Sequence, residues 1–350
     1  MHGTSSVLVF GIAFAILSGI MNGIFTLPMR YLGQLPWENV WAIVMLVPCV
    51  LMPITMVLIA VPGFVHVLAA APTHAVLFAC LLGFAWGFGA IMFGQGVSAI
   101  GISMGNTLAL AISASFGSVL PILVLAPARL HLAQGHAIIL GMLIGVAGIV
   151  CFGYAGFRRE QSQKDHIELT RGNMVGNARP FGIGLLLCTG SGLLSAIFNI
   201  GYSLGQPVMQ TAVRMGYSTF AGTDVIWLLM LTCGSVPSLV FCGYLLRKNG
   251  TWKQYAAPGS KRLYILVIGM GLMWGGHTYL YGFASPKLGK LGPAIGWPLT
   301  LMAALITVNA CGFLAGEWKL TRLRDRQWMA LGMLVTLAAI AVLGWSSTLG

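Results

Sequence analysis

The chain has 350 residues, of which 57% are hydrophobic and 7% are charged, and its formal net charge is +12. A soluble domain carries roughly 25% charged residues, so this composition excludes an ordinary soluble fold. The basic excess does not indicate nucleic-acid binding, because the Lys and Arg residues lie in short segments between long apolar runs.

Ten apolar segments follow one another along the chain. A hydrocarbon core about 30 Å thick needs roughly 20 apolar residues in a helix, and the segments reach that length. Their apolar runs show no sustained period-two alternation, which argues against a β-barrel. The predicted helical spans are 7–29, 38–61, 74–100, 102–126, 136–157, 181–205, 221–246, 263–285, 289–316 and 327–349.

The longest polar interruption divides the ten spans into two groups of five. It covers residues 158–180, contains five of the Lys and Arg residues, and is typical of a solvated linker. The predicted organisation is therefore a first five-helix repeat over 1–157, a cytoplasmic basic linker over 158–180, and a second five-helix repeat over 181–350.

The basic residues are distributed unequally between the two sides of the membrane. Fifteen of the 19 Lys and Arg residues lie on the side of the linker, and four lie on the side of the termini. Cytoplasmic loops carry the excess of Lys and Arg in membrane proteins. We therefore predict a cytoplasmic linker and periplasmic termini in a bacterial-type inner membrane.

The two groups of spans share a sequence pattern. Gly83-x-x-Trp86-Gly87 in the first group recurs as Gly271-x-x-Trp274-Gly275 in the second, and Glu38-x-x-Trp41 recurs as Asp224-x-x-Trp227 at nearly the same offset. Because each group has an odd number of spans, the second enters the membrane from the opposite face. The predicted fold is an all-α polytopic membrane protein whose ten transmembrane helices form two inverted five-helix repeats. Secondary transporters use such repeats to expose one site to either side in turn.

Polar and aromatic side chains inside the spans are candidates for a substrate site. A sugar site needs groups that pair with hydroxyls and aromatic faces that cover C–H surfaces. Packing alone is the alternative for each buried aromatic. Trp37, Trp41 and Trp345 lie near span ends and are interpreted as interfacial anchors. The predicted substrate-binding residues are Asn22, Trp86, Gln95, Asn106, Asn199, Trp274, His277 and Tyr281, with Tyr279, Trp297 and Asn309 as further candidates.

Four ionisable side chains are candidates for proton coupling or gating. His277 lies deep in a predicted span and has an ordinary pKa near neutrality, although a neutral histidine bonded to a neighbouring helix is the alternative. Glu38 and Asp224 are repeat-equivalent and are expected near opposite membrane faces, where local interaction with a helix N-terminus is the alternative. Glu317 sits beside Lys319, and a loop ion pair is its alternative. We rank His277 first and Glu38 second for proton coupling.

The remaining acids are predicted to be solvated charges, either in the linker or, for Asp325, in a basic loop. Motifs of hydrolases, metalloproteases and phosphate-binding loops are not found, so an enzyme is not expected. The spacing of the seven Cys residues indicates neither a disulfide framework nor a metal site, and no cofactor is predicted. A channel would need a selectivity filter or a charged ring, and the sequence carries no such signal. Oligomeric state is left open.

Several motifs resemble one family of transporters. The stretch Gly83-Phe-Ala-Trp-Gly-Phe-Gly89, followed by Ile100-Gly-Ile-Ser-Met-Gly105, is similar to the third and fourth helices of the L-rhamnose–proton symporter family, part of the drug/metabolite transporter superfamily. Pro36-Trp-Glu-Asn-Val-Trp41 resembles the start of its second helix, and Gly316-Glu-Trp318 resembles the end of its ninth. The resemblance covers nearly the whole chain. It implies two inverted five-helix repeats in the lipid bilayer, with a sugar and a proton as the partners that are imported together. The alternative is a drug/metabolite-type exporter or an uncoupled facilitator of another small polar metabolite.

Overall fold

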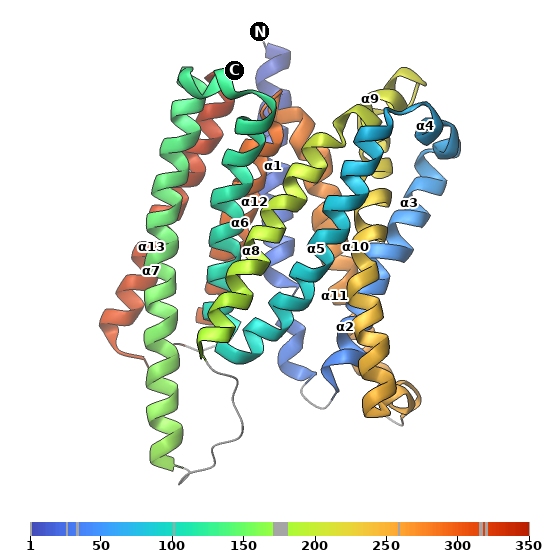
Figure 1. Ribbon diagram of the computed structural model, residues 1–350. Coiled ribbons are helices and arrows are strands. Elements are labelled where there is room, and N and C mark those ends of the chain that lie inside the picture. Colours follow the sequence, from blue (N-terminus) through green and yellow to red (C-terminus); the bar gives the residue numbers. More distant parts are fainter. Residues whose placement is uncertain are drawn as a thin grey trace.

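The computed structural model is a bundle of helices (Figure 1). It describes residues 2–25, 27–32, 35–100, 102–170, 181–257, 260–314, 318 and 321–349. Within these residues, 10 helical segments are long and apolar enough to cross a membrane. The predicted all-α membrane protein with ten spans is confirmed. Helices suit this environment because lipid offers backbone N–H and C=O groups no partners, so each span must satisfy its own.

Eight of the ten spans are single helices, and two are interrupted. The single helices are α1 (His2–Ile24), α5 (Thr73–Ile100), α6 (Ile102–Leu125), α7 (Ala133–Thr170), α10 (Thr219–Asn249), α11 (Ser260–Ala284), α12 (Gly292–Leu314) and α13 (Leu323–Ser346). The second span consists of α2 (Trp37–Leu46), the π-helical turn η2 (Val47–Leu51) and α3 (Met52–Ala60), and α4 (Phe64–Ala70) follows it. The sixth span is α8 (Phe181–Leu204), continued by α9 (Gln206–Arg214).

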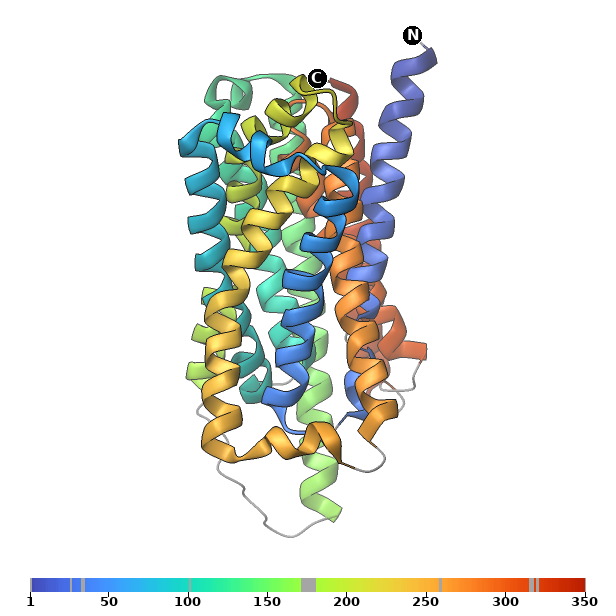
Figure 2. The same cartoon turned by 90° about the vertical axis from the view of Figure 1, so that its right-hand side faces the viewer.

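The two ends of the bundle are distinct. Both termini lie at one end, which we call the terminal end, and the far end of α7 points away from the other, which we call the linker end (Figures 1 and 2). Helix α7 is longer than the predicted 136–157 span, because it continues into the 158–180 segment as far as Thr170. Its 38 residues extend about 57 Å at 1.5 Å per residue, so it exceeds the hydrocarbon thickness. Residues 171–180 lie outside the described part.

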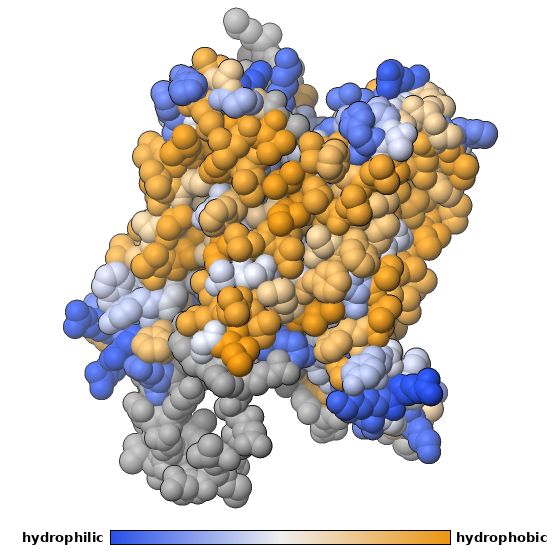
Figure 3. All heavy atoms as spheres, in the orientation of Figure 1, coloured by the Kyte–Doolittle hydropathy of each residue, from blue (hydrophilic) through white to orange (hydrophobic). Residues whose placement is uncertain are grey.

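The surface of the bundle matches a membrane environment. An apolar band surrounds the middle of the visible face, and hydrophilic residues gather at the two ends (Figure 3). Large side chains such as Ile59, Leu186 and Val240 are exposed on the bundle. Lipid tails cover such a band at no cost in free energy, whereas water would not.

Glycines let pairs of spans approach closely. A Cβ added at Gly83 or Gly87 of α5 would overlap the backbone carbonyl of Met230 or Gly234 in α10. Helices α11 and η2 make the corresponding approach, since a Cβ on Gly271 would lie 3.0 Å from the Cβ of Val47. Small residues drive helix association in lipid because they bring backbones into van der Waals contact. The third span therefore packs on the seventh, and the eighth packs on the second.

Helix α1 packs in the same manner against α12. A Cβ on Gly19 would overlap the backbone carbonyl of Thr300, and one on Gly23 would lie 2.7 Å from the carbonyl oxygen of Ala304. Helix α8 packs against α6, where a Cβ on Gly192 would lie 2.8 Å from the carbonyl oxygen of Ala109. The first span therefore packs on the ninth, and the sixth packs on the fourth.

Candidate functional site

A cavity of about 120 Å³ lies inside the bundle, bounded by seven of its helices. These helices are α1, α2, α5, α6, α8, α11 and α12. The residues that line it are Asn22, Gly23, Phe25, Trp41, Val44, Met45, Trp86, Ala90, Phe93, Asn106, Ala109, Leu110, Ser113, Ser191, Ser195, Phe198, Trp274, His277, Thr278, Tyr281, Trp297, Leu301, Ala304 and Val308. Among the residues that the structure describes, this lining contains no Asp, Glu, Lys or Arg, so it presents neutral side chains.

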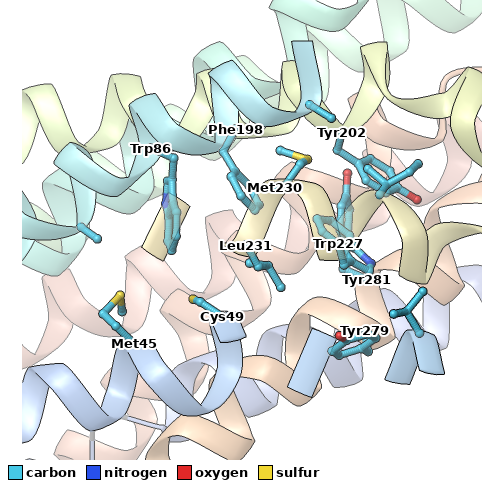
Figure 4. Close-up of a cluster of buried hydrophobic side chains, with 14 of the residues drawn as sticks. Met45, Cys49, Trp86, Phe198, Tyr202, Trp227, Met230, Leu231, Tyr279 and Tyr281 are labelled. Carbon is cyan, nitrogen blue, oxygen red and sulfur yellow. The ribbon is translucent and has the colours of Figure 1, made fainter. Parts of the chain in front are cut away.

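Stacked aromatic rings form one wall of the cavity. Trp86 of α5 and Trp274 of α11 lie face to face, with ring centroids 5.3 Å apart and ring planes at 15°. Phe198 of α8 packs against Trp86 with centroids 4.9 Å apart (Figure 4). Such a wall offers flat apolar faces together with the weak negative potential of aromatic rings.

Trp41 belongs to this cavity, and the prediction that it is an interfacial anchor is wrong. Its ring is buried and lines the cavity from α2. Trp37, one turn earlier, stacks on it with centroids 5.4 Å apart. The Trp41 indole N–H is buried and has no hydrogen-bond partner among the residues that the structure describes. Trp41 is therefore near the end of a span in sequence but lies inside the bundle and not at the membrane interface.

His277 lies between the cavity and α1. Ser18 Oγ donates a hydrogen bond of 2.7 Å to the His277 backbone carbonyl, and it also lies 3.4 Å from the ring Nδ1. Thr278 Oγ1 lies 3.4 Å from Nε2. Both ring nitrogens therefore face hydroxyl groups, which can serve either tautomer of a neutral imidazole.

Asn199 lies behind the cavity, where it connects four helices on the side of the terminal end. Its Nδ2 donates to the carbonyl oxygens of Gly117 in α6 at 2.8 Å and of Pro293 in α12 at 3.0 Å. Its Oδ1 accepts a bond of 2.5 Å from the hydroxyl of Tyr281 in α11. The amide is fully buried and is used within the protein.

Of the remaining predicted substrate-binding residues, some line the cavity and others lie outside it. Asn22 and Asn106 line the cavity, as does Trp297, whose Nε1 donates to Ser113 Oγ at 3.1 Å. Gln95 is half-buried in α5 and lies outside the lining. Asn309 donates to the Leu305 carbonyl within its own helix, and Tyr279 is buried away from the cavity.

Glu38 and Asp224 lie at opposite ends of the bundle and differ in their surroundings. Glu38 lies in the first turn of α2 at the linker end, where its Oε1 accepts hydrogen bonds from Asn249 Nδ2 at 2.9 Å and Thr251 Oγ1 at 3.0 Å. Asp224 lies near the start of α10 at the terminal end, fully buried, and neither carboxylate oxygen has a hydrogen-bond partner in the described structure. Glu317 lies outside the described residues.

Asp325 is not a solvated charge, and that prediction is wrong. Its side chain is 3% exposed in the first turn of α13, and it forms an ion pair with Arg158 of α7 at 3.5 Å. The neighbouring Arg159 guanidinium lies over the ring of Trp318, 5.3 Å from its centroid. The basic residues at the linker end therefore also fasten the fifth span to the tenth and its preceding loop.

Sequence reasoning missed the hydroxyl groups of the cavity. Ser113, Ser191, Ser195 and Thr278 all line it. Serine and threonine are common in membrane helices, where they often bond to the carbonyl one turn earlier, so their presence alone gives no signal. For Thr278 the sequence repeat does provide a signal. Thr278 lies four residues after Trp274, as Ala90 lies four residues after Trp86, and both Thr278 and Ala90 line the cavity.

Comparisons with known proteins agree along the full length of the chain. The sequence model of the L-rhamnose-proton symport protein family matches residues 4–348. The L-rhamnose-proton symporter of Yersinia pestis (strain Pestoides F) is 22% identical over 350 residues, which cover 97% of this chain and 98% of the relative. The L-rhamnose-proton symporter of Yersinia pseudotuberculosis serotype IB (strain PB1/+) matches with the same identity and coverage. These relatives are named as transporters rather than enzymes.

Proposed function

Because the chain belongs to the L-rhamnose-proton symport protein family, we propose that it imports a neutral sugar such as L-rhamnose together with a proton. The single observation that carries the proposal is the uncharged cavity, which combines an aromatic wall with amide and hydroxyl groups. Aromatic faces suit the C–H surfaces of a sugar, and the polar groups suit its hydroxyls. A charged substrate would find no opposite charge in the lining.

The size and chemistry of the cavity favour one small molecule. Its volume of about 120 Å³ suits a single sugar ring better than an oligosaccharide. Asn22 and Asn106 supply both donors and acceptors. In this proposal Trp86, Trp274, His277 and Tyr281 complete the site, while Asn199 supports it from behind.

The proposed duplication is supported by the positions that line the cavity. In α5 they are Trp86, Ala90 and Phe93, and in α11 the positions at the same spacing, Trp274, Thr278 and Tyr281, also line it. The span contacts also correspond, since the third span packs on the seventh as the eighth packs on the second. This correspondence is what two inverted five-helix repeats, 1–157 and 181–350, would produce around a shared site.

A difference between the two proposed repeats supports alternating access. Trp41 and Val44 of α2 line the cavity, whereas their repeat counterparts, Trp227 and Met230 of α10, are packed in the core with no exposure. Since α2 begins at the linker end and α10 begins at the terminal end, the cavity extends toward the linker end. We infer that exchange of the two repeat conformations buries Trp41 and Val44 and opens the cavity beside Trp227 and Met230.

Cysteine labelling tests this exchange. In a background without the seven native cysteines, Val44→Cys is expected to react with a polar thiol reagent added from the linker side. Met230→Cys, its matched counterpart, is expected to react from the terminal side, and sugar is expected to change both rates. Reaction of both positions from one side only would contradict alternating access by these repeats.

Uptake by reconstituted vesicles tests the function itself. L-Rhamnose and a panel of neutral and acidic sugars would be offered to proteoliposomes with and without an inward proton gradient. Accumulation of a neutral sugar that collapses when the gradient is removed is the expected result. Equilibration without accumulation would replace the symporter with a facilitator, and movement of the sugar outward against its gradient would indicate an exporter.

The direction of the chain in the membrane belongs to the same proposal. The excess of Lys and Arg at the linker end supports a cytoplasmic linker and periplasmic termini. In that orientation the cavity extends toward the cytoplasm, as expected for an importer that has closed behind its substrate.

A further inference from the structure

Asp224 is a buried carboxyl group with nothing to neutralise it. Its side chain is fully buried near the terminal end of α10, and both carboxylate oxygens are without a hydrogen-bond partner in the described structure. Asp325 provides the contrast, because it is nearly as buried but is paired with Arg158. An ionised carboxylate buried without a partner costs several kcal/mol, so such a group neutralises instead.

We propose that Asp224 is the carboxyl group that binds the transported proton, and that it carries this proton in the terminal-closed conformation described here. This inference rests on the proposed function, since it names the proton site of the same symporter. In the terminal-open conformation water reaches the first turns of α10, and the carboxylate takes up one proton there. Closure then buries a neutral carboxylic acid. Loss of the proton toward the linker side leaves an unpaired buried carboxylate, which favours reopening of the terminal side, where water can hydrate the charge again.

The groups around Asp224 suit a proton. Tyr279 of α11 is its titratable neighbour, and the Tyr279 hydroxyl is likewise buried without a hydrogen-bond partner in the described structure. Tyr279 also interacts electrostatically with Cys49 of η2, which carries no positive charge. The cation on the neighbouring helix α9, Arg214, donates a hydrogen bond to Thr211. These neighbours place no cation in an ion pair with Asp224. One nearby hydroxyl is also few ligands for a sodium ion, which prefers several oxygens.

Asp224 is linked to the cavity along α10 through the ring of Trp227. Trp227 lies one turn further along α10 and stacks on Tyr202, with centroids 4.6 Å apart. The Trp227 ring also contacts Phe198 at 5.9 Å and Tyr281 at 6.1 Å between centroids, and both of these residues line the cavity (Figure 4). A sugar in the cavity would contact Phe198 and Tyr281, which pack against Trp227 one turn from Asp224, and these contacts provide a physical route for coupling.

The other two candidates that the structure describes are better satisfied in this conformation. Glu38 accepts hydrogen bonds from Asn249 and Thr251, which stabilise its ionised form at the linker end. His277 has a hydroxyl near each ring nitrogen and can stay neutral. Of the three, Asp224 is the group whose charge is incompatible with the structure as it stands.

The decisive variant is Asp224→Asn, which mimics the protonated acid permanently. Proteoliposomes would be assayed for counterflow, in which labelled L-rhamnose exchanges for unlabelled sugar inside, and for accumulation driven by a proton gradient. The variant is expected to retain counterflow and to lose both accumulation and sugar-induced proton movement. Glu38→Gln is the matched control and is expected to retain accumulation. Proton-driven accumulation by Asp224→Asn, or accumulation by the unmodified protein driven by a sodium gradient instead, would overturn the assignment.

Failure of the proposed symport function would give a different result from failure of the Asp224 assignment. If the unmodified protein moved L-rhamnose without any proton, the symport proposal would fail, whatever Asp224→Asn did. A second measurement on the unmodified protein needs no substitution. Dicyclohexylcarbodiimide, an apolar reagent that adds to protonated carboxyl groups, is expected to modify Asp224 and to spare the ion-paired Asp325, with modification decreasing as the pH rises. Mapping by mass spectrometry that found Asp224 unmodified at every pH would refute the assignment.

Discussion

Removal of the Asn199 side chain is expected to release the terminal end of the bundle. The amide makes three buried hydrogen bonds, to Gly117, Pro293 and Tyr281, and together they join α8 to α6, α12 and α11. A buried hydrogen bond contributes about 0.5–1.5 kcal/mol net, so the three contribute about 2–4 kcal/mol. In an alternating-access transporter these bonds are made only while the terminal side is closed. Asn199→Ala should therefore shift the equilibrium toward the terminal-open conformation.

The size of that shift follows from the free energy lost. Each 1.4 kcal/mol is a factor of ten, so about 2–4 kcal/mol corresponds to roughly a 30-fold to 1,000-fold change in the ratio of the two conformations. The assay is hydrogen exchange followed by mass spectrometry on protein in lipid nanodiscs. Peptides from the first turns of α12 and the middle of α6 are expected to exchange faster in Asn199→Ala.

The matched control lies one turn further along the same helix. Ser203 is also buried, but its hydroxyl donates to the Asn199 backbone carbonyl within α8, so it joins no other helix. Ser203→Ala is expected to leave exchange in α6 and α12 unchanged. If Asn199→Ala and Ser203→Ala behaved alike, the bonds of Asn199 would not hold the terminal end closed, and the reasoning would be refuted.

Three further outcomes are expected. Asn106→Leu should weaken L-rhamnose uptake about tenfold, because the lost hydrogen bond leaves a sugar hydroxyl unpaired at a cost of about 1–3 kcal/mol. Gln95→Leu should have a smaller effect, because Gln95 lies outside the cavity lining. Equal losses of uptake in the two variants would place both residues in one site. Gly83→Ala should lower the free energy of unfolding of the purified protein by about 1–3 kcal/mol, because the new methyl would overlap the Met230 carbonyl oxygen of α10. Gly271→Ala should cost less, because its methyl would meet Val47 and Pro48 at 3.0 Å or more; a more harmful Gly271→Ala would contradict this. A reporter enzyme fused within 171–180 should be active only if it functions in the cytoplasm, and periplasmic activity there would reverse the proposed orientation.

The ten spans could be predicted because bilayer thickness imposes a length on every helix. Helix boundaries at the linker end were harder to predict, because bilayer thickness does not limit a helix that extends beyond the membrane, as α7 does to Thr170. The ion pair of Asp325 with Arg158 was also out of reach, because the two residues are far apart in sequence and both sit in segments rich in charge.

The residues of the site could be predicted only in part, because the membrane-spanning helices have no distinct polar face. A helix that is apolar on all sides gives no period that separates its cavity side from its lipid side. Asn106 and Gln95 are equivalent by composition, yet tertiary packing puts the first in the cavity lining and the second outside it. Asn199 shows the same limit, since an amide inside a span can fasten helices as readily as it can bind a ligand.

The stack of Trp86 on Trp274 has a consequence for how the protein arose. Under the proposed inverted duplication, the two rings are copies of one residue, and they meet as a residue meets itself across a twofold axis. A single five-helix ancestor that inserted in both orientations could have completed this wall by pairing with its own copy. Fusion of two such copies would free each half to diverge, in keeping with the cavity-lining His277 and Tyr281, whose equivalent positions in the first half are Gly89 and Phe93. An asymmetric sugar needs an asymmetric site, and divergence of the two halves adds a chemical asymmetry that identical halves could have obtained only by differing in conformation.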